Sequence, residues 1–156
     1  MRLALGTSII TALSIALAGA AGAVTSFSAH SVGERAVPPT NSQGGGDALF
    51  VLDDSNEFTY YIQILGALSG PPTGCHVCGP ARAGETAPVL YSIIPGSYME
   101  GSLGILTDVE IAPLMAGLWY CNLETRQYPT GEIRCQILDV VAAQPHTWGA
   151  IKQFYR

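Results

Sequence analysis

The amino-acid sequence predicts an all-β protein: an antiparallel Greek-key β-sandwich with one short helix and a C-terminal tail. First, the 156 residues include 18 glycines and ten prolines, which favour short strands joined by turns over long helices. Second, apolar and polar residues alternate with a period of two along several segments, as in half-buried strands. Third, turn signals separate about six to eight such segments, which is typical of a sandwich. The length leaves room for one domain with a sizeable core.

The charge pattern excludes one class of partner. Charged residues make up 12% of the chain, the formal net charge is −5, and the sequence contains no run of lysines or arginines. Nucleic-acid binding therefore has no electrostatic basis.

The N-terminal segment predicts export. Arg2 is the only charge before Glu34, residues 3–17 are apolar or small, and Ala18 to Ala23 reads AGAAGA. A positive start, an apolar stretch and an A-x-A ending define a secretory signal peptide over residues 1–23, with cleavage after Ala23. The alternative is a retained anchor, but the apolar run is short for a span of about 20 residues. We therefore expect a secreted, periplasmic or cell-envelope protein with no membrane span in the mature chain.

The strands are predicted from the alternation. The segments 47–53 and 58–64 read as a hairpin across the turn Asp53-Asp54-Ser55-Asn56. Further strands are expected over 88–94, 118–124 and 132–141, with another short run starting at Val77.

One helix is predicted from its caps. Thr107 followed by Glu110 forms a capping box, so a helix should run from about Asp108 to Ala116 and end at Gly117, with Pro113 inside it. The sandwich then spans residues 24–141, and residues 142–156 form a linker and a short amphipathic tail. The part of the tail from Thr147 to Arg156 either packs back on the sandwich, is disordered, or serves as a sorting or anchoring signal.

Two longer motifs carry a family resemblance. Residues 60–81 read YYIQILGALSGPPTGCHVCGPA, and residues 116–137 read AGLWYCNLETRQYPTGEIRCQI. Over residues 27–138 the chain resembles the CHRD domain, the module first described in chordin and also found in bacterial secreted proteins. Its most specific piece is PTGEIRCQ at 129–136, where the family typically reads P-G-G-E-I-R-G-Q. The matching residues are Gly79, Pro80, Asn122, Gly131, Glu132, Ile133, Arg134 and Gln136.

The resemblance implies a sandwich similar to that of Cu,Zn superoxide dismutase, with family histidines that could bind copper. His76 keeps the first histidine of the family's H-x-H turn, Cys78 replaces the second, and Glu124 stands at the third histidine position. Dismutase chemistry needs a redox metal held mainly by imidazole, so we expect no dismutase activity and no catalytic residues.

The resemblance implies a binding or structural module without a cofactor, whose partner is an unknown protein or envelope component. The sequence offers no Ser-His-Asp set, phosphate loop or pair of acid–base carboxylates, so we expect the module to be non-catalytic. Copper or zinc bound by His76, Cys78 and Glu124 is the alternative, because these are legitimate ligands and residues two apart share a strand face. A weaker alternative is a thiol redox protein that uses Cys75 and Cys78.

Four cysteines in an exported protein predict disulfides. Cys121 and Cys135 lie opposite each other if the hairpin is symmetric about Tyr128, and both then face the apolar side. That register also opposes Glu124 and Glu132; a slip of two residues would pair Glu124 with Arg134 instead. The sequence leaves both registers open. Cys75 and Cys78 can bond only if the chain turns at His76-Val77, because an extended strand holds them about 10 Å apart.

The remaining polar candidates are interpreted as structural. Glu132 and Arg134 share a face of the last strand and are expected to form an exposed ion pair, with ligand contact as the alternative. His30 and His146 are interpreted as bystanders.

Overall fold

The computed structural model describes residues 24–140. The predicted signal peptide and the segment that contains His146 and the amphipathic tail lie outside these residues. Nine strands, one α-helix and one 3-10 helix are described in residues 24–140: β1 (Thr25–Val32), η1 (Gly33–Arg35), β2 (Gly45–Leu52), β3 (Glu57–Leu65), β4 (Pro72–Cys78), β5 (Val89–Ile93), β6 (Tyr98–Ile105), α1 (Asp108–Met115), β7 (Tyr120–Thr125), β8 (Ile133–Gln136) and β9 (Leu138–Asp139).

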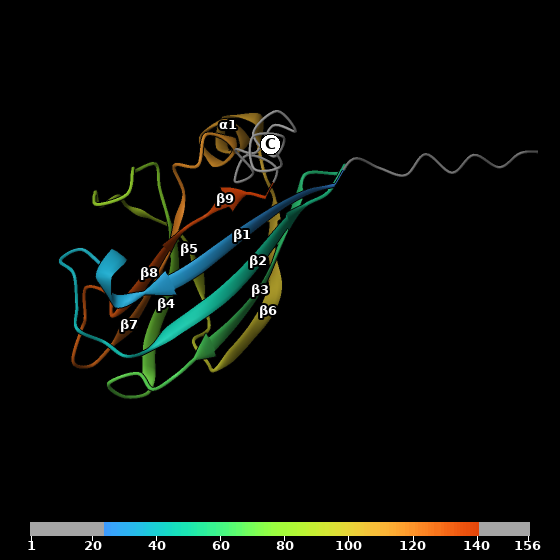
Figure 1. The fold of residues 1–156 in the computed structure, drawn as a ribbon. Helices are drawn as coiled ribbons and strands as arrows, with labels where there is room; N and C mark the ends of the chain where they lie inside the picture. The colour runs from blue at the N-terminus through green and yellow to red at the C-terminus, as the bar shows by residue number, and fades with distance from the viewer. Residues whose placement is uncertain (1–23, 141–156) are drawn as a thin grey trace, which may run out of the picture.

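The strands form one antiparallel sheet that curls into a nearly closed barrel (Figure 1). The strand order is β5-β4-β7-β8-β1-β2-β3-β6, and β9 also pairs with β1. The two end strands, β5 and β6, are neighbours in sequence and are joined by residues 94–97. The all-β antiparallel prediction is confirmed. The two separate layers of a sandwich are not seen as separate sheets, because β1 pairs with β8 through Val32 and Arg134 and so joins them.

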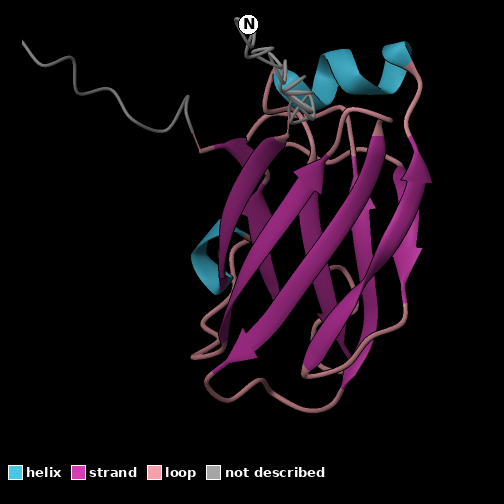
Figure 2. Cartoon of the chain, turned by 90° about the vertical axis from the view of Figure 1, so that its right-hand side faces the viewer, coloured by secondary structure: helices cyan, strands magenta, loops and turns pink. Residues whose placement is uncertain are grey.

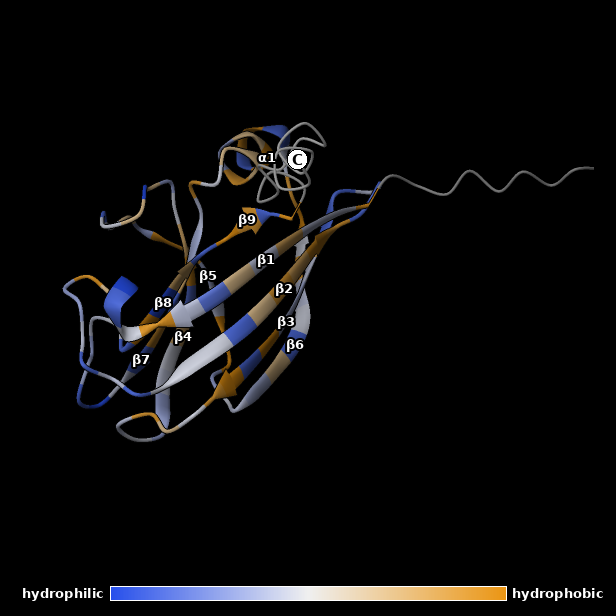
Figure 3. Ribbon diagram, in the orientation of Figure 1, coloured by the Kyte–Doolittle hydropathy of each residue, from blue (hydrophilic) through white to orange (hydrophobic). Residues whose placement is uncertain are grey.

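The core fills the barrel. Polar and apolar positions alternate along β1, β2 and β3, so that one face of each strand is inside (Figure 3). Phe58 lies at the centre of an aromatic group, with ring centroids 6.0 Å from Phe27, 5.4 Å from Phe50 and 5.9 Å from Trp119. Such aromatic pairs add to the free energy of burial and fix how the strands face one another.

Helix α1 lies across one end of the barrel (Figure 2) and confirms the capping-box prediction. The Glu110 carboxylate accepts hydrogen bonds from the Thr107 amide at 2.9 Å and from the Thr107 hydroxyl at 2.6 Å. Gly117 follows the helix with φ of +69°, and Leu114 is fully buried against the core. The helix therefore closes this end of the barrel.

The hairpin across residues 53–56 is also confirmed, since β2 and β3 pair along their full lengths from Gly45–Leu65 to Leu52–Phe58. Three expectations differ from the structure. The short run expected to start at Val77 is the end of β4, which begins at Pro72. The alternation did not predict β6, in which Met99 is the only buried residue. The last expected strand, 132–141, is divided into β8 and β9, with Ile137 between them.

No helix in residues 24–140 combines the length and the apolar character needed to cross a membrane.

Candidate functional site

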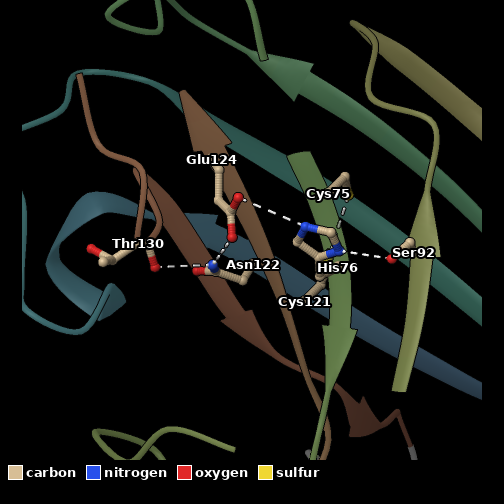
Figure 4. A network of polar contacts seen from close by, with 7 residues as sticks. All are labelled: Cys75, His76, Ser92, Cys121, Asn122, Glu124 and Thr130. Carbon is tan, nitrogen blue, oxygen red and sulfur yellow. Dashed lines mark hydrogen bonds and ion pairs between the residues drawn. The ribbon is translucent and has the colours of Figure 1, made fainter. Parts of the chain in front are cut away.

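His76 lies on the outer face of the sheet, where β4 runs between β5 and β7 (Figure 4). Its Nδ1 is 3.2 Å from the Ser92 hydroxyl of β5, and its Nε2 is 3.7 Å from Oε2 of Glu124 on β7. Asn122 lies directly opposite His76 and donates to Glu124 Oε1 at 3.5 Å and to the Thr130 carbonyl at 3.1 Å. The structure thus brings two of the three predicted ligand positions, His76 and Glu124, together.

The space between these two side chains depends on Gly74. A Cβ atom at Gly74 would lie 2.7 Å from Glu124 Oε2 and 2.9 Å from His76 Nε2. Both distances are shorter than van der Waals contact, so a side chain here would push the imidazole and the carboxylate apart. Gly74 therefore permits their approach.

Cys78 shares this outer face but belongs to another cluster. It packs with Tyr120 and Ala81 under the loop that follows β4, and burial raises the pKa of its thiol. Within residues 24–140 no group of three or more histidine, cysteine, aspartate or glutamate side chains is arranged to hold a metal ion. One imidazole and one carboxylate do not fit the imidazole-rich set of a redox copper site or the four ligands of structural zinc.

The four cysteines lie in buried positions and are not bonded to one another in this structure. Cys121 lies directly opposite Cys135, in the symmetric register, and its Sγ is 3.8 Å from Cys75 Sγ on β4. Contact with the Cys135 and Cys75 thiols, together with burial, raises the pKa of Cys121 well above its ordinary value. The disulfide expectation stays a prediction, and three candidate thiols, Cys75, Cys121 and Cys135, meet in the core.

Cys75 and Cys78 lie on opposite faces of β4. β4 continues to Cys78 without a turn at His76-Val77, so Cys75 enters the core and Cys78 the outer cluster. Since redox cysteines depend on an accessible, low-pKa thiolate, this arrangement does not support thiol exchange through Cys75 and Cys78.

The expected surface ion pair between Glu132 and Arg134 is wrong. Both residues are buried, and their side chains point in different directions. The slipped register is also wrong, because Arg134 lies opposite Asn122 and not Glu124. The Glu124 and Glu132 carboxylates have different partners, since Glu124 lies near His76 and Glu132 accepts from the Thr125 hydroxyl.

Glu132 is held by four hydrogen bonds, which we call the Glu132 network. Oε1 accepts from the Ser42 hydroxyl at 2.6 Å and the Ser69 amide at 2.7 Å. Oε2 accepts from the Ser69 and Thr125 hydroxyls, both at 2.5 Å. Burial alone would raise the pKa of Glu132, but these hydrogen bonds outweigh it and lower the pKa. The network ties two loops to the end of the β7–β8 hairpin.

Other motif residues also serve the fold. A Cβ at Gly131, where φ is +129°, would lie 2.2 Å from Asn122 Oδ1, and one at Gly79 would lie 2.6 Å from Trp119 Cδ1. Pro80 follows Gly79, and Ile133 is buried in the core. Gln136 donates from Nε2 to the carbonyls of Ala81 and Gly117, both at 2.8 Å. These residues hold the hairpin and the loop after β4 in place.

Arg134 is the exception among the motif residues. Its guanidinium carbon lies 3.6 Å from the centre of the Tyr120 ring, and Nη2 donates to the Arg82 carbonyl at 3.3 Å. No carboxylate within residues 24–140 forms an ion pair with it. Burial lowers the pKa of Arg134 from its ordinary value.

A groove of about 1000 Å³ opens on this side of the molecule. We call it the Arg134 groove. Residues of β1, β2, β8 and β9 line it, together with η1 and the loop at Ala83-Gly84. His30 and Asp47 lie on its wall, with Nδ1 and Oδ1 2.6 Å apart, and Arg35 donates to the His30 carbonyl at 2.6 Å. His30 is therefore part of a polar cluster. We had expected His30 to be a bystander, and no sequence motif links it to Asp47 or Arg35.

The fold places this chain among the all-β antiparallel proteins, with one sheet of nearly closed, barrel-like form and one short helix. More particularly, it belongs to the CHRD domain family, whose model matches residues 27–137. No curated protein and no solved structure matches the chain.

Proposed function

We propose that this chain is an exported, non-catalytic CHRD-domain binding module that holds its ligand in the Arg134 groove. The groove carries the proposal: its volume of about 1000 Å³ is at the upper end of the range typical of ligand sites. Its lining combines apolar residues, including Val37, Pro39 and Leu138, with a few charged ones. That composition is the usual one for a site that binds a small organic molecule.

The rival functions have weaker support. His76 and Glu124 supply only two ligands for a metal, and the four cysteines, all buried, supply no exposed thiol. A binding role needs neither. We also propose that the fold is of the superoxide dismutase-like type that the family resemblance implied. That fold type does not require dismutase activity.

The experiment fills the groove with a bulky side chain. Ser28 lies exposed on β1 and lines the groove, so Ser28→Trp should block it. Ser102→Trp is the matched control, because Ser102 is an exposed position on β6 outside the groove. The probe is anilinonaphthalene sulfonate, an apolar anion whose fluorescence rises on binding. We expect saturable binding to the wild type and to Ser102→Trp, and loss of it in Ser28→Trp. Equal binding by both variants would disprove the groove as the ligand site.

Export is tested separately. The mass of the protein recovered outside the cytoplasm should correspond to a chain that begins at Val24, as the A-x-A pattern predicts. A recovered chain that still carries residues 1–23 would contradict this part of the proposal.

A further inference from the structure

The lining of the Arg134 groove combines polar and apolar groups. Arg134 and Gln136 of β8 line it, together with the apolar residues Val37 and Pro39 after η1 and Leu138 of β9. A molecule that fills this groove therefore meets both charged groups and apolar surface.

Arg134 is a buried cation with spare hydrogen-bond donors. The residue is 2% exposed, yet among its donors only Nη2 has an acceptor in the described part of the chain. Within residues 24–140 the only fully enclosed side-chain nitrogen or oxygen without a hydrogen-bond partner is Trp119 Nε1. The unpartnered nitrogens of Arg134 are therefore not fully enclosed, and Arg134 is one of the residues that line the groove.

An unpaired buried charge is costly, so this arrangement requires a reason. Removing one partner from a buried ion pair destabilises proteins strongly, because the other charge is left uncompensated. Tyr120 offsets part of the cost for Arg134, since its ring lies under the guanidinium and its hydroxyl is fixed at the backbone of Ala87. Tyr120 also fixes the direction of the guanidinium, which is then preorganised for a planar acceptor.

The other charged groups of the groove favour one negative charge over two. The Asp47 carboxylate contacts the His30 imidazole, and the Arg35 guanidinium donates a hydrogen bond to the His30 carbonyl. Glu34 is the second carboxylate of the lining. A single negative charge on the ligand can pair with Arg134. The second charge of a dianion such as a phosphate monoester would add repulsion from Glu34, while Arg35 already donates to the His30 carbonyl.

We propose that the groove binds a small amphipathic monocarboxylate, with the carboxylate on the Arg134 guanidinium and the apolar body along Val37, Pro39 and Leu138. The pairing is a charge-assisted hydrogen bond from the free arginine donors to the carboxylate oxygens, which arginine can make in bidentate form. This inference rests on the proposed function, because it names the ligand class of the same groove.

The test compares octanoate with octanol and octyl phosphate as competitors of anilinonaphthalene sulfonate on the purified protein. Octanoate and octanol share the apolar chain and differ in the carboxylate. We expect octanoate to displace the dye at least about tenfold more effectively than octanol, since hydrogen bonds to charged groups are worth that much or more. Octanoate should also compete better than octyl phosphate.

Variants identify the group responsible. Arg134→Met should remove the preference for octanoate and leave octanol unchanged, while Arg134→Lys should keep part of it. If Arg134→Met does not fold, the comparison of Arg134→Lys with the wild type decides the question, and Ser102→Trp serves as the folded control. An unchanged preference for octanoate in Arg134→Lys would count against Arg134 as the anchor.

The outcomes separate the two proposals. Equal displacement by octanoate and octanol, with dye binding still lost in Ser28→Trp, would overturn the carboxylate inference and leave the groove as the binding site. If octyl phosphate competes better than octanoate, the inference that the ligand carries a single negative charge is wrong. Dye binding that Ser28→Trp does not affect would overturn the proposed function itself.

Discussion

Ser69 holds Glu132 with two hydrogen bonds, one from its amide to Oε1 and one from its hydroxyl to Oε2. The two residues are far apart in sequence, and the Glu132 side chain is fully buried. The contact connects the loop between β3 and β4 to the residue just before β8. Because all four donors in the Glu132 network point at one carboxylate, the protein depends on that group being both present and ionised.

Replacing Glu132 with glutamine should destabilise the fold by about 3 kcal/mol. The amide keeps the shape but places an NH2 group where a carboxylate oxygen now accepts hydrogen bonds, and buried donors without acceptors are costly. Chemical denaturation in urea measures the change in the free energy of unfolding. The control is Asp54→Asn, an exposed site in the β2–β3 turn, where we expect a change within about 0.5 kcal/mol. Similar values for the two variants would show that the network does not stabilise the fold.

The pH dependence of stability provides a second test of the same carboxylate. The pKa of Glu132 is lowered in the fold from its ordinary value near 4.5. A carboxyl of this kind stabilises the folded state above its unfolded pKa, and the stabilisation is lost as pH falls through the folded pKa. The difference in stability between wild type and Glu132→Gln should therefore be constant near neutral pH and shrink below about pH 4.5. Asp53 and Glu110 also have lowered pKa values, but they titrate in both proteins and cancel in the difference. A difference that grows with acidity would contradict the prediction.

Gly131→Ala should cost about 3 kcal/mol of stability. Its φ of +129° is unfavourable for any residue with a side chain, and the added Cβ would lie 2.2 Å from Asn122 Oδ1. Gly104→Ala is the matched control, because Gly104 also has a positive φ, of +94°, but has open space around it. We expect about 1 kcal/mol there, so the difference between the two variants isolates the collision with Asn122. Thermal unfolding followed by circular dichroism measures both, and equal losses would contradict the role given to Asn122.

Oxidation should join Cys75 to Cys121 and leave Cys135 reduced. Their sulfur atoms are already 3.8 Å apart. Cys121 lies opposite Cys135 in the ladder. The hydrogen bond from the Ile137 amide to the Trp119 carbonyl, two residues away, shows that Cys121 and Cys135 occupy a hydrogen-bonded pair position. At such a position the Cβ atoms are farther apart than a disulfide prefers. A low-molecular-weight disulfide such as oxidised glutathione serves as the oxidant, and it takes up the two electrons and two protons of the thiols.

Tryptic mapping after alkylation distinguishes the possible bonds, because Arg82, Arg126 and Arg134 divide the chain between the cysteines. Peptide 36–82 should be linked to peptide 83–126. The bond should add about 3 kcal/mol of stability, and Cys121→Ala should lose it. Cys78→Ala, in the separate outer cluster, should keep it. A link from peptide 83–126 to the peptide that begins at Cys135 would contradict this choice.

Local patterns predicted the parts of the fold that local residues determine. The β2–β3 hairpin follows from alternation on both sides of a polar turn, and α1 follows from Thr107 and Glu110. β6 could not be predicted, because it contains Gly101 and Gly104 and buries only Met99. The single sheet could not be predicted either, since it depends on a short pairing of Val32 with Arg134 between distant strands.

The sequence predicted only the part of the candidate site that lies on two neighbouring strands, β4 and β7. The approach of His76 to Glu124 follows from strand faces and the resemblance. The Glu132 network draws on Ser42, Ser69 and Thr125 from three separate segments, and no local pattern links them. The Arg134 groove could not be predicted from local sequence either. The burial of an arginine without a carboxylate partner becomes visible only in the folded chain.

The meeting of the two ends of the described chain has a consequence for how the domain can be used. The Val140 amide donates a hydrogen bond to the Ser26 carbonyl at 3.1 Å, so the two ends of the described chain lie side by side. Residues 94–97 connect β5 and β6, the two strands at the ends of the sheet order. A short linker from 140 to 24 and a cut between Pro95 and Gly96 would therefore leave every strand pairing in place. Such a circular permutant should fold, and for the same reason the module can be inserted into a surface loop of another protein without separating that loop's ends.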